Sequence, residues 1–311
     1  MAQPVQALQA TLPICIEFAA GKAIVRTLAE QRDTEAGRIA FARAFCHSLV
    51  CAYWQSIASG YGSWCQVRCV PVTLPRLTKS EAFLARDLAE LLSGMKPLEV
   101  GYRVGTIYTA ALPPQTRSAL GAFYTPPALA NRLLDLIEAG GFSWLSGSVI
   151  DPACGGGAFL APVALRMLSC ADRNSADILE SLCHRLVGQE VDAFAAWLAQ
   201  IFLDIVLLPL CAPARQTLPQ IVQVVDSLKT KPDRSFDLVV GNPPYGRLRL
   251  DQKMRNAYAR SLYGHANLYG LFVDLALRLV ANQGVVAYVT PTSFFGGQYF
   301  KALRSLIQEE A

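Results

Sequence analysis

Hydrophobic side chains recur at helical spacing through the first hundred residues of the chain. Residues 35–60 carry apolar side chains three and four positions apart, which is the period of an α-helix with one buried face. Thr78 and Glu81 stand three positions apart at the start of a second such segment, in the spacing of a helix capping box. Runs typical of strands are rare here. We therefore predict a mainly helical N-terminal module over residues 1–110, followed by a linker at 111–120.

The pattern changes after residue 121, where short runs rich in valine and isoleucine alternate with helical segments. Thr125 is expected to cap the first helix of this part, because prolines follow it directly. Strands are predicted at GSVID, LVGQEV, QIVQVVD, FDLVVGN and GVVAYVTP, and helices near 157–169, 175–184, 193–207, 267–281 and 298–308. This alternation predicts a doubly wound, Rossmann-like α/β fold with a parallel sheet over 121–311. Ligands bind such sheets at the carboxyl ends of the strands.

Composition sets broad limits on the kind of protein. Of the 311 residues, 52% are hydrophobic and 17% are charged, which suits a chain with a large core and argues against disorder. The net charge of +4 is compatible with a polyanionic partner without identifying one. The nine cysteines are odd in number and form no C-x-x-C pair, so we expect reduced, buried thiols in a cytoplasmic protein and no metal site.

One segment has the composition of a membrane span. Residues 193–214 are strongly apolar, but Gln200, Asp204 and Pro209 interrupt them. A helix packed on a sheet explains this pattern better than a bilayer span. The N-terminus has no basic leader before an apolar run, so no signal peptide is expected. The sequence thus predicts no membrane partner.

Acidic residues follow three successive predicted strands. Asp151 precedes the glycine run 155–157, which lets the backbone approach a ligand but does not form the dinucleotide motif G-x-G-x-x-G. Glu190, with Asp192 as second choice, can accept hydrogen bonds from a ribose diol, and Asp226 can accept one from an adenine amino group. Each feature alone also fits a plain turn, a solvated charge or a helix cap. Together they form a line that favours S-adenosylmethionine, a nucleoside with a cationic tail, over a phosphate-bearing nucleotide.

The stretch Asn242-Pro243-Pro244-Tyr245 ends the fourth predicted strand. Proline has no N–H to donate, so the carbonyl of Pro243 and the side-chain oxygen of Asn242 can converge as two acceptors on a planar NH2 group. Two such hydrogen bonds draw a conjugated amine toward tetrahedral geometry and free its lone pair for attack. The ring of Tyr245 can stack on a base, which is worth about 1–3 kcal/mol. The structural alternative is a proline-rich turn that ends a buried strand.

These motifs together resemble the adenine-N6-specific DNA methyltransferases of the restriction-modification type, in which the cofactor motif precedes NPPY. The matching stretches, in the family's order, are GAFYTPP (121–127), DPACGGGAFL (151–160), GQEVD (188–192), VVDSL (224–228), VVGNPPYG (239–246), NLYGLFVDLALRLV (267–280) and GVVAYVTPTSFFGGQYFKALR (284–304). The resemblance implies the fold of an S-adenosylmethionine-dependent methyltransferase and a catalytic domain over residues 121–311.

The family's functional residues map onto this sequence motif by motif. The residues implied to contact the cofactor are Tyr124, Thr125, Pro126, Asp151, Pro152, Ala153, Cys154, Gly155, Glu190, Asp226 and Asn242. Those implied in catalysis are Asn242, Pro243, Pro244 and Tyr245, with Phe300 as a second aromatic residue against a flipped base. Phe300 fits a core phenylalanine equally well, and its aromatic neighbours in sequence are Phe294, Phe295 and Tyr299. The implied reaction is methyl transfer to the N6 amine of an adenine swung out of duplex DNA.

A basic loop follows the predicted catalytic turn. It contains Arg247, Arg249, Lys253, Arg255 and Arg260. We expect these cations to contact DNA phosphates, although an ordinary solvated loop has the same composition. Double-stranded DNA is therefore the expected partner, with a specificity or restriction subunit of a modification complex as a further one.

Two other functions stay open on the sequence alone. NPPY also suits a protein glutamine amide or an RNA base, although families with those substrates favour D-x-G-x-G over DPAC and commonly lack FYTPP. The second is a non-catalytic DNA-binding subunit, and the intact NPPY stretch argues against it. Relatives usually continue past the last residues of this sequence into a target-recognition region, and we identify no such region within it.

Overall fold

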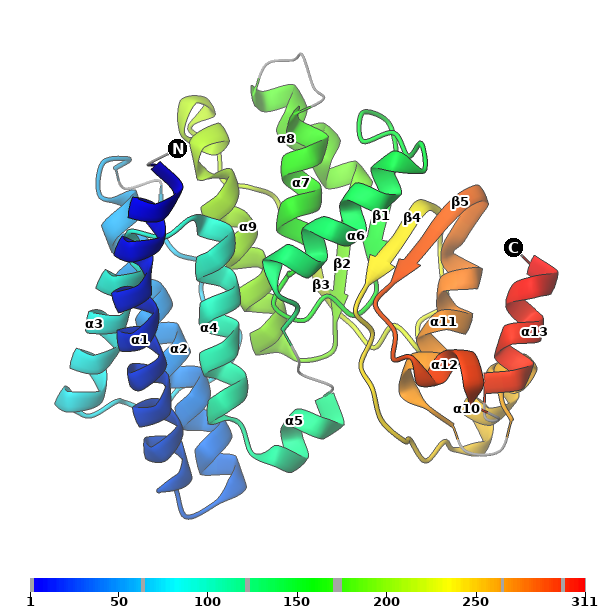
Figure 1. The fold of residues 1–311 in the computed structure, drawn as a ribbon, viewed down its shortest axis with the longest axis horizontal. Coiled ribbons are helices and arrows are strands. Elements are labelled where there is room, and N and C mark those ends of the chain that lie inside the picture. Colours follow the sequence, from blue (N-terminus) through cyan, green and yellow to red (C-terminus); the bar gives the residue numbers. More distant parts are fainter. Residues whose placement is uncertain are drawn as a thin grey trace. The chain divides into compact units, whose positions relative to one another are not determined.

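The computed structural model divides the chain into two compact units, Met1–Arg117 and Ser118–Ala311 (Figure 1). The residues that it describes are 3–62, 65–120, 124–169, 175–263, 266–297 and 300–310. All the site residues that the sequence predicts fall in the second unit.

The first unit is built from helices, as the hydrophobic spacing predicts. They are α1 (Gln3–Glu30), α2 (Glu35–Ala58), α3 (Lys79–Ser93), α4 (Pro97–Ala111) and α5 (Pro114–Leu120). α3 begins with the predicted capping box, in which the Thr78 side chain accepts from the Glu81 N–H and the Glu81 carboxylate accepts from the Thr78 N–H. The segment 111–120, predicted as a linker, contains α5, and the division between the units falls inside that helix.

Close packing of helices forms the core of the first unit. Phe45, Leu49 and Leu88 are fully buried, and burial of apolar faces supplies most of the stability of helices in proteins. A Cβ on Gly21 would lie 2.6 Å from Cδ2 of Leu88. The side chain of Leu88 thus fills the space beside Gly21 where α1 meets α3.

The second unit is centred on a five-stranded sheet whose neighbouring strands are all parallel. The strands are β1 (Val149–Asp151), β2 (Leu186–Glu190), β3 (Val222–Val224), β4 (Phe236–Gly241) and β5 (Val280–Tyr288), in the spatial order β3-β2-β1-β4-β5 (Figure 1). The prediction of a doubly wound α/β fold is confirmed. The chain runs outward from β1 to β3 and then returns to β4 on the other side of β1, so the strand order reverses between β1 and β4, where such sheets bind ligands.

β5 begins earlier than the sequence suggests. We predict it from Gly284, but it starts at Val280, directly after α11 (Leu268–Leu279). The pairing of β5 with β4 shifts within this first part of the strand. Gln283 there has a φ of +64°, which a non-glycine residue adopts mainly in irregular backbone. Gly284 therefore marks an irregularity inside the strand rather than its start.

Helices lie before, between and after the strands, except between β3 and β4, and several of them pack against the sheet. Before β3 these are α6 (Pro127–Ala139), α7 (Leu160–Ser169), α8 (Ser175–Arg185) and α9 (Ala193–Ala214). After β4 come α10 (Gln252–Ala257), a 3-10 turn (Ala259–Ser261) and α11, and after β5 come α12 (Ser293–Gly296) and α13 (Lys301–Glu310). α7, α8 and α9 pack against β2, while α11 packs against β4 and β5. The predicted helices match α6, α7, α8, α9, α11 and α13 with shifted ends, whereas α10, the 3-10 turn and α12 were not predicted.

The strongly apolar helix α9 belongs to the core of the second unit. Its length and hydropathy would suit a membrane span, but 83% of its most apolar window is buried inside the protein. Gln200 on this helix is buried and accepts hydrogen bonds from the N–H groups of Ile221 and Val222, at 2.9 and 3.0 Å, so it secures the edge strand β3. The helix continues past its predicted end at residue 207, through Pro209 and Pro213 to Ala214.

Candidate active site

The carboxyl end of β1 continues into a tight glycine turn. Gly155 and Gly157 have φ angles of +53° and +82°, a region that favours glycine. A Cβ on Gly156 would fall 2.1 Å from the ring of Tyr124, so the turn lies directly against that ring. A Cβ on Gly155 would meet no described atom within 4 Å. The turn is thus covered at Gly156 and open above Gly155.

Asp151, the last residue of β1, is 1% exposed. Its Oδ1 accepts a hydrogen bond from the N–H of Ala153 at 3.1 Å. Gly241, at the end of β4, leaves room for this carboxyl group, since a Cβ there would be 2.7 Å from Oδ1. Burial raises the pKa of Asp151 to about 8, and the nearby Glu190 adds to the effect. A cation bound beside Asp151 would favour its charged form.

Glu190, the last residue of β2, is held by main-chain donors. Its Oε2 accepts from the N–H of Gly155 at 3.0 Å, and its Oε1 accepts from the N–H of Asp192 at 2.8 Å. Burial raises the pKa of Glu190 in spite of these hydrogen bonds. Asp192, the second choice from sequence, caps α9 by accepting from the N–H groups of Phe194 and Ala195. Glu190 is therefore the acid that faces the glycine turn.

Asp226 follows β3 and is half-exposed, with its Oδ2 2.7 Å from the ammonium group of Lys229. The adjoining Ser227 is buried, and its hydroxyl donates to the carbonyl of Pro152 at 2.7 Å, which ties this loop to the turn after β1. Sequence reasoning missed Ser227, whose only signal was a small polar residue in VVDSL. The strand order places the three acids in succession along one edge of the sheet. Within the described ranges, no group of three or more His, Cys, Asp or Glu side chains is arranged to hold a metal ion.

Cys154 lies beneath the glycine turn. Its side chain is 4% exposed, and its N–H donates to the carbonyl of Gln189 at 2.9 Å, which joins the ends of β1 and β2. Its Sγ would be 3.2 Å from a Cβ on Gly188. Burial raises the pKa of the thiol well above its usual value. A neutral, buried thiol supports the turn by packing and brings no charge to it.

Asn242 follows β4 and is held on both sides of its amide. Its Nδ2 donates to Oγ1 of Thr125 at 3.1 Å, and its Oδ1 accepts from the hydroxyl of Tyr245. The same hydroxyl lies 3.1 Å from the carbonyl oxygen of Val289. Burial raises the pKa of Tyr245, so its hydroxyl stays a neutral donor.

Thr125 does not cap α6, and the prediction that it does is wrong. The helix starts at Pro127, its N-cap residue is Pro126, and no side chain bonds to its first N–H groups. Proline at the start of a helix lacks one of the N–H groups that a cap would satisfy. Thr125 is 4% exposed, and its hydroxyl contacts Asn242 instead.

The remaining NPPY residues form a rigid and partly covered turn. Pro243 is buried, while Pro244 and Tyr245 are half-buried. Among the described residues, none donates a hydrogen bond to the carbonyl oxygen of Pro243. The Tyr245 ring packs edge-on against Tyr269, with the centroids 6.1 Å apart and the planes at 80°. This turn therefore offers a carbonyl acceptor and part of an aromatic ring.

Phe300 lies in the core of the second unit. Its side chain is 7% exposed, and its ring centroid is 4.8 Å from that of Tyr269 and 6.1 Å from that of Phe294. Tyr299 and the side chain of Phe295 lie outside the described part of the chain. The structure thus gives Phe300 the place of a core residue, which the sequence left open, and its stacking role stays a prediction without a contact to support it.

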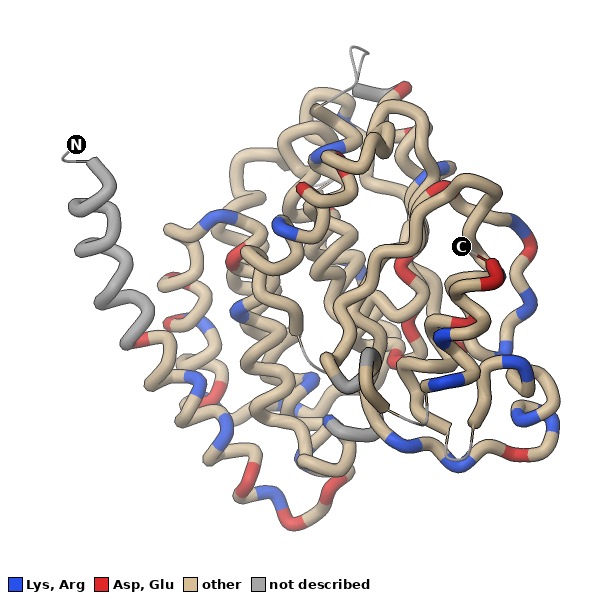
Figure 2. The backbone as a smooth tube through the Cα atoms, turned by 45° about the vertical axis from the view of Figure 1, so that its right-hand side comes forward, with Lys and Arg blue, Asp and Glu red and all other residues tan. Residues whose placement is uncertain are grey.

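Most of the cations predicted to contact DNA are exposed. They are Arg247, Arg249, Lys253 and Arg255. The structure records no ion pair or side-chain hydrogen bond for these four within the residues it describes. Asp251 beside them caps α10 by accepting from the N–H of Met254 at 2.7 Å. Lys and Arg positions of this stretch lie together at the lower right of Figure 2, and they leave an exposed basic surface after the NPPY turn.

Arg260 takes part in an ion pair with α11, and its predicted contact with DNA stays a prediction. Its Nε and Nη2 lie 2.9 and 2.7 Å from Oδ1 of Asp274, which is fully buried, and its Nη1 contacts Glu310. Burial opposes ionisation of Asp274, but hydrogen bonds from Arg278 and Arg260 outweigh it and lower its pKa. A buried carboxylate requires such partners. Arg260 therefore anchors the basic loop to α11.

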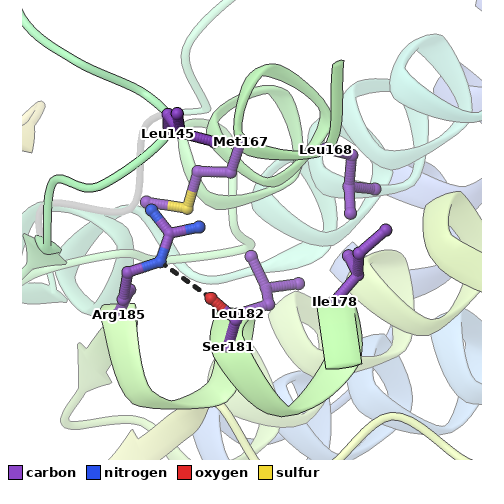
Figure 3. Close-up of a pocket in the computed structure, with 7 residues that line it drawn as sticks. All are labelled: Leu145, Met167, Leu168, Ile178, Ser181, Leu182 and Arg185. Atoms are coloured by element: carbon purple, nitrogen blue, oxygen red, sulfur yellow. Dashed lines mark hydrogen bonds between the residues drawn. The ribbon is translucent and has the colours of Figure 1, made fainter. Parts of the chain in front are cut away.

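A small pocket lies away from these residues in the second unit (Figure 3). Its lining residues are Leu145, Met167, Leu168, Ile178, Ser181, Leu182 and Arg185. Arg185 donates to Oγ of Ser181 at 3.1 Å and to the carbonyls of Trp144 and Gly147, at 3.0 and 3.1 Å. The polar groups of this pocket thus serve the packing of α8.

Sequence comparison relates the chain to known methylases. Residues 195–311 match the family described as Eco57I restriction-modification methylase. The Type II methyltransferase M.TthHB8I of Thermus thermophilus is 30% identical over 216 residues, which cover 66% of this chain and 42% of that protein. The chain thus spans about two fifths of the length of this curated relative.

Solved structures share the fold at low sequence identity. A class I S-adenosylmethionine-dependent methyltransferase from Listeria monocytogenes has a TM-score of 0.54 and 16% identity, over 94% of this chain and 79% of that one. The DrdV–DNA complex has a TM-score of 0.61 and 13% identity, over 95% of this chain and 34% of that one. The chain is thus similar to methylases of the restriction-modification type, and it has the α/β fold of the class I S-adenosylmethionine-dependent methyltransferases.

Proposed function

We propose that the chain transfers a methyl group from S-adenosylmethionine to the N6 amine of an adenine in double-stranded DNA. The observation that carries the proposal is the position of Asn242, whose amide contacts Thr125 at the point where β4 adjoins β1. Gly241 brings the same strand end against Asp151. This arrangement supports a methyl-donor site and an amine site side by side, which direct transfer requires.

The residues after β1, β2 and β3 fit the proposed methyl donor. The open space above Gly155 would admit it, and its cationic, ribose and adenine parts suit Asp151, Glu190 and Asp226 in turn. Tyr288, the last residue of β5, has a buried hydroxyl with no hydrogen-bond partner among the described residues. A buried group of this kind calls for a ligand or a water molecule. S-adenosylmethionine would supply a methyl group on a positively charged sulfur, which a modestly acidic pocket suits.

The target amine would be held by Asn242 and Pro243. The Pro243 carbonyl and a lone pair on Oδ1 of Asn242 can accept its two N–H groups. These hydrogen bonds free the lone pair of the amine, so no general base is needed before the attack. Stacking of the base on the exposed part of Tyr245, worth about 1–3 kcal/mol, would offset part of the few kcal/mol needed to swing the base out of the duplex.

DNA would be held in part by the exposed cations that follow the NPPY turn. Arg247, Arg249, Lys253 and Arg255 are free to contact phosphates, which position a protein on DNA without reading its sequence. One structure with the same fold is a complex with DNA, which supports this part of the proposal. We further propose that the protein is cytoplasmic, has no membrane partner and works with a specificity or restriction subunit.

Methyl transfer from labelled cofactor tests the proposal directly. The chain is incubated with tritiated S-adenosylmethionine and, in separate reactions, unmethylated duplex DNA, RNA and release-factor protein. Label in DNA that digests to N6-methyladenine supports the proposal. Label in RNA or protein favours the alternative substrates, label in N4-methylcytosine moves the target to another base, and cofactor binding without any label favours a non-catalytic subunit. Each of these three results contradicts the proposed function.

A further inference from the structure

We infer that Thr125 is a positioning residue for the transfer step, because its hydroxyl holds the amide of Asn242 in the orientation that receives the target amine. The sequence motif implies a cofactor contact for Thr125, so the role inferred here differs from the one that the sequence suggests. The inference rests on the proposed function, since the role of Asn242 in holding the amine belongs to that proposal.

The contact joins two distant parts of the second unit. Oγ1 of Thr125 lies 3.1 Å from Nδ2 of Asn242, although the residues are 117 positions apart. Thr125 is 4% exposed, so little water competes for its hydroxyl. Pro126 and Pro127 follow it and start α6 without a side-chain cap. The hydroxyl is therefore not engaged by the helix, and the rigid backbone of the two prolines fixes its place.

The other side of the amide is also held. The hydroxyl of Tyr245 donates to Oδ1 of Asn242 and lies 3.1 Å from the carbonyl of Val289. The N–H of Val289 donates to the carbonyl of Gly241 at 3.0 Å, so this second acceptor is fixed to the end of β4. A tyrosine hydroxyl has one proton and here two acceptors. When a target amine donates to Oδ1, the O–H group of Tyr245 can turn to donate to the Val289 carbonyl instead, keeping its proton and leaving Oδ1 to the amine.

Thr125 restricts rotation of the Asn242 amide about its terminal torsion. The terminal torsion of asparagine is broad and nearly two-fold, so the oxygen and the NH2 group exchange places readily unless partners distinguish them. A rotated Asn242 would point its own NH2 at the amine, donor against donor. Tyr245 donates to the oxygen and Thr125 accepts from the NH2 group, so each end of the amide has its own partner, and loss of the Thr125 hydroxyl would free the NH2 end to rotate.

Valine and serine at position 125 separate this role from a cofactor contact. Thr125→Val keeps the shape and removes the hydroxyl, whereas Thr125→Ser keeps the hydroxyl. We expect Thr125→Val to lower kcat about 10–100-fold while the Kd for S-adenosylmethionine changes less than about threefold, and Thr125→Ser to recover most of the rate. Thr109→Val is the matched control, since its hydroxyl bonds only carbonyls of its own helix α4. A higher Kd for the cofactor with kcat unchanged would overturn the inference.

A stability cycle tests the contact without any methylation assay. Thermal unfolding is measured for the full chain, Thr125→Val, Asn242→Ala and the double variant. If the hydroxyl holds the amide, Thr125→Val has a smaller effect once Asn242 is alanine. Strictly additive shifts in Tm would show that the two side chains do not interact and would contradict the inference. Absence of label in DNA would instead refute the proposed function, so the two failures are distinguishable.

Discussion

The two sides of the central sheet hold their functional side chains by different means. On the side of β1, β2 and β3, main-chain N–H groups hold the acids, as when the N–H of Ala153 donates to Asp151 and that of Gly155 donates to Glu190. On the side of β4 and β5, Asn242 and Tyr245 are held by Thr125 and Val289, which are distant in sequence. A main-chain donor is present whatever the side chain of its residue, whereas a contact between two side chains is lost when either one is replaced. We call the part of the site at β1, β2 and β3 the donor side and the part at β4 and β5 the target side. Side-chain substitutions that abolish function on the target side should therefore be tolerated better on the donor side.

Replacement of Asn242 should have the largest effect on methyl transfer. This effect should be confined to the target side and leave cofactor binding intact. Asn242→Ala removes one of two proposed acceptors, and we expect methyl transfer to fall about 10³-fold with cofactor Kd within about threefold of the parent. Transfer is measured with tritiated cofactor and binding by calorimetry. Asn131→Ala on α6 is the control, with both quantities unchanged. If Asn242→Ala kept more than about a tenth of the activity, its assigned role would be wrong.

A methyl group at position 241 should damage both sides at once. The Cβ of Gly241→Ala would sit 2.7 Å from Oδ1 of Asp151, so the carboxyl group or the strand ends that carry it must shift. We expect a loss of about 1–3 kcal/mol in the free energy of unfolding, as for overpacking elsewhere, together with weaker cofactor binding. Thermal unfolding and calorimetry measure the two effects. Gly94→Ala is the control, because its Cβ would meet no described atom within 4 Å, and equal Tm values for both variants would contradict the packing argument.

Cofactor affinity should depend on pH through Asp151. In the free protein Asp151 keeps its proton up to about pH 8. The titratable groups that interact electrostatically with it are Glu190, Cys154 and Tyr288. A bound cation favours the carboxylate, so binding releases the proton and affinity should rise about tenfold per pH unit up to that value. Calorimetry between pH 6 and 9 checks this slope. Asp151→Asn should bind weakly with a flat profile, and an unchanged slope in that variant would assign the titration to another group.

The same carboxyl group should make the stability of the folded protein depend on pH. Stability should fall as pH rises, whereas cofactor affinity should rise. The folded pKa of Asp151, about 8, lies above the unfolded value of 3.8, so the folded state holds an extra proton between these limits and stability falls as pH rises through them. Asp151→Asn removes this penalty. We expect its Tm to exceed that of the parent at pH 8 and the gain to vanish near pH 4. A gain that is equal at both pH values would refute the buried-acid explanation.

The smallest expected effects concern two arginines of the basic loop. One is exposed and should affect DNA binding, and the other pairs with a buried carboxylate and should affect stability. Arg249→Ala should weaken DNA binding about 3–10-fold and reduce the salt slope by about one, with Tm unchanged. Arg260→Ala should instead lower the Tm, because Asp274 is fully buried and loses one of its cations. Fluorescence anisotropy with duplex DNA at several salt concentrations and thermal unfolding give the two readouts. A lower Tm for Arg249→Ala would show that its exposed position is misread.

The sequence by itself determined the fold of the second unit and the arrangement of its acids. Alternating periodicity gave the parallel strands, and the position of Asp151, Glu190 and Asp226 directly after their strands put them on one edge. The capping box at Thr78 also followed from spacing alone. These features are readable because each depends on residues a few positions apart, where backbone geometry leaves little choice.

Only the tertiary structure decided which partners the remaining side chains take. Thr125 contacts Asn242 instead of capping α6, Arg260 pairs with the buried Asp274, and Phe300 packs into the core. Each outcome depends on which segments, dozens of residues apart, meet in space and on how much water is excluded there. Local spacing carries no information about those distances, and burial then makes the chosen partner obligatory because an unpaired polar group in the core is costly.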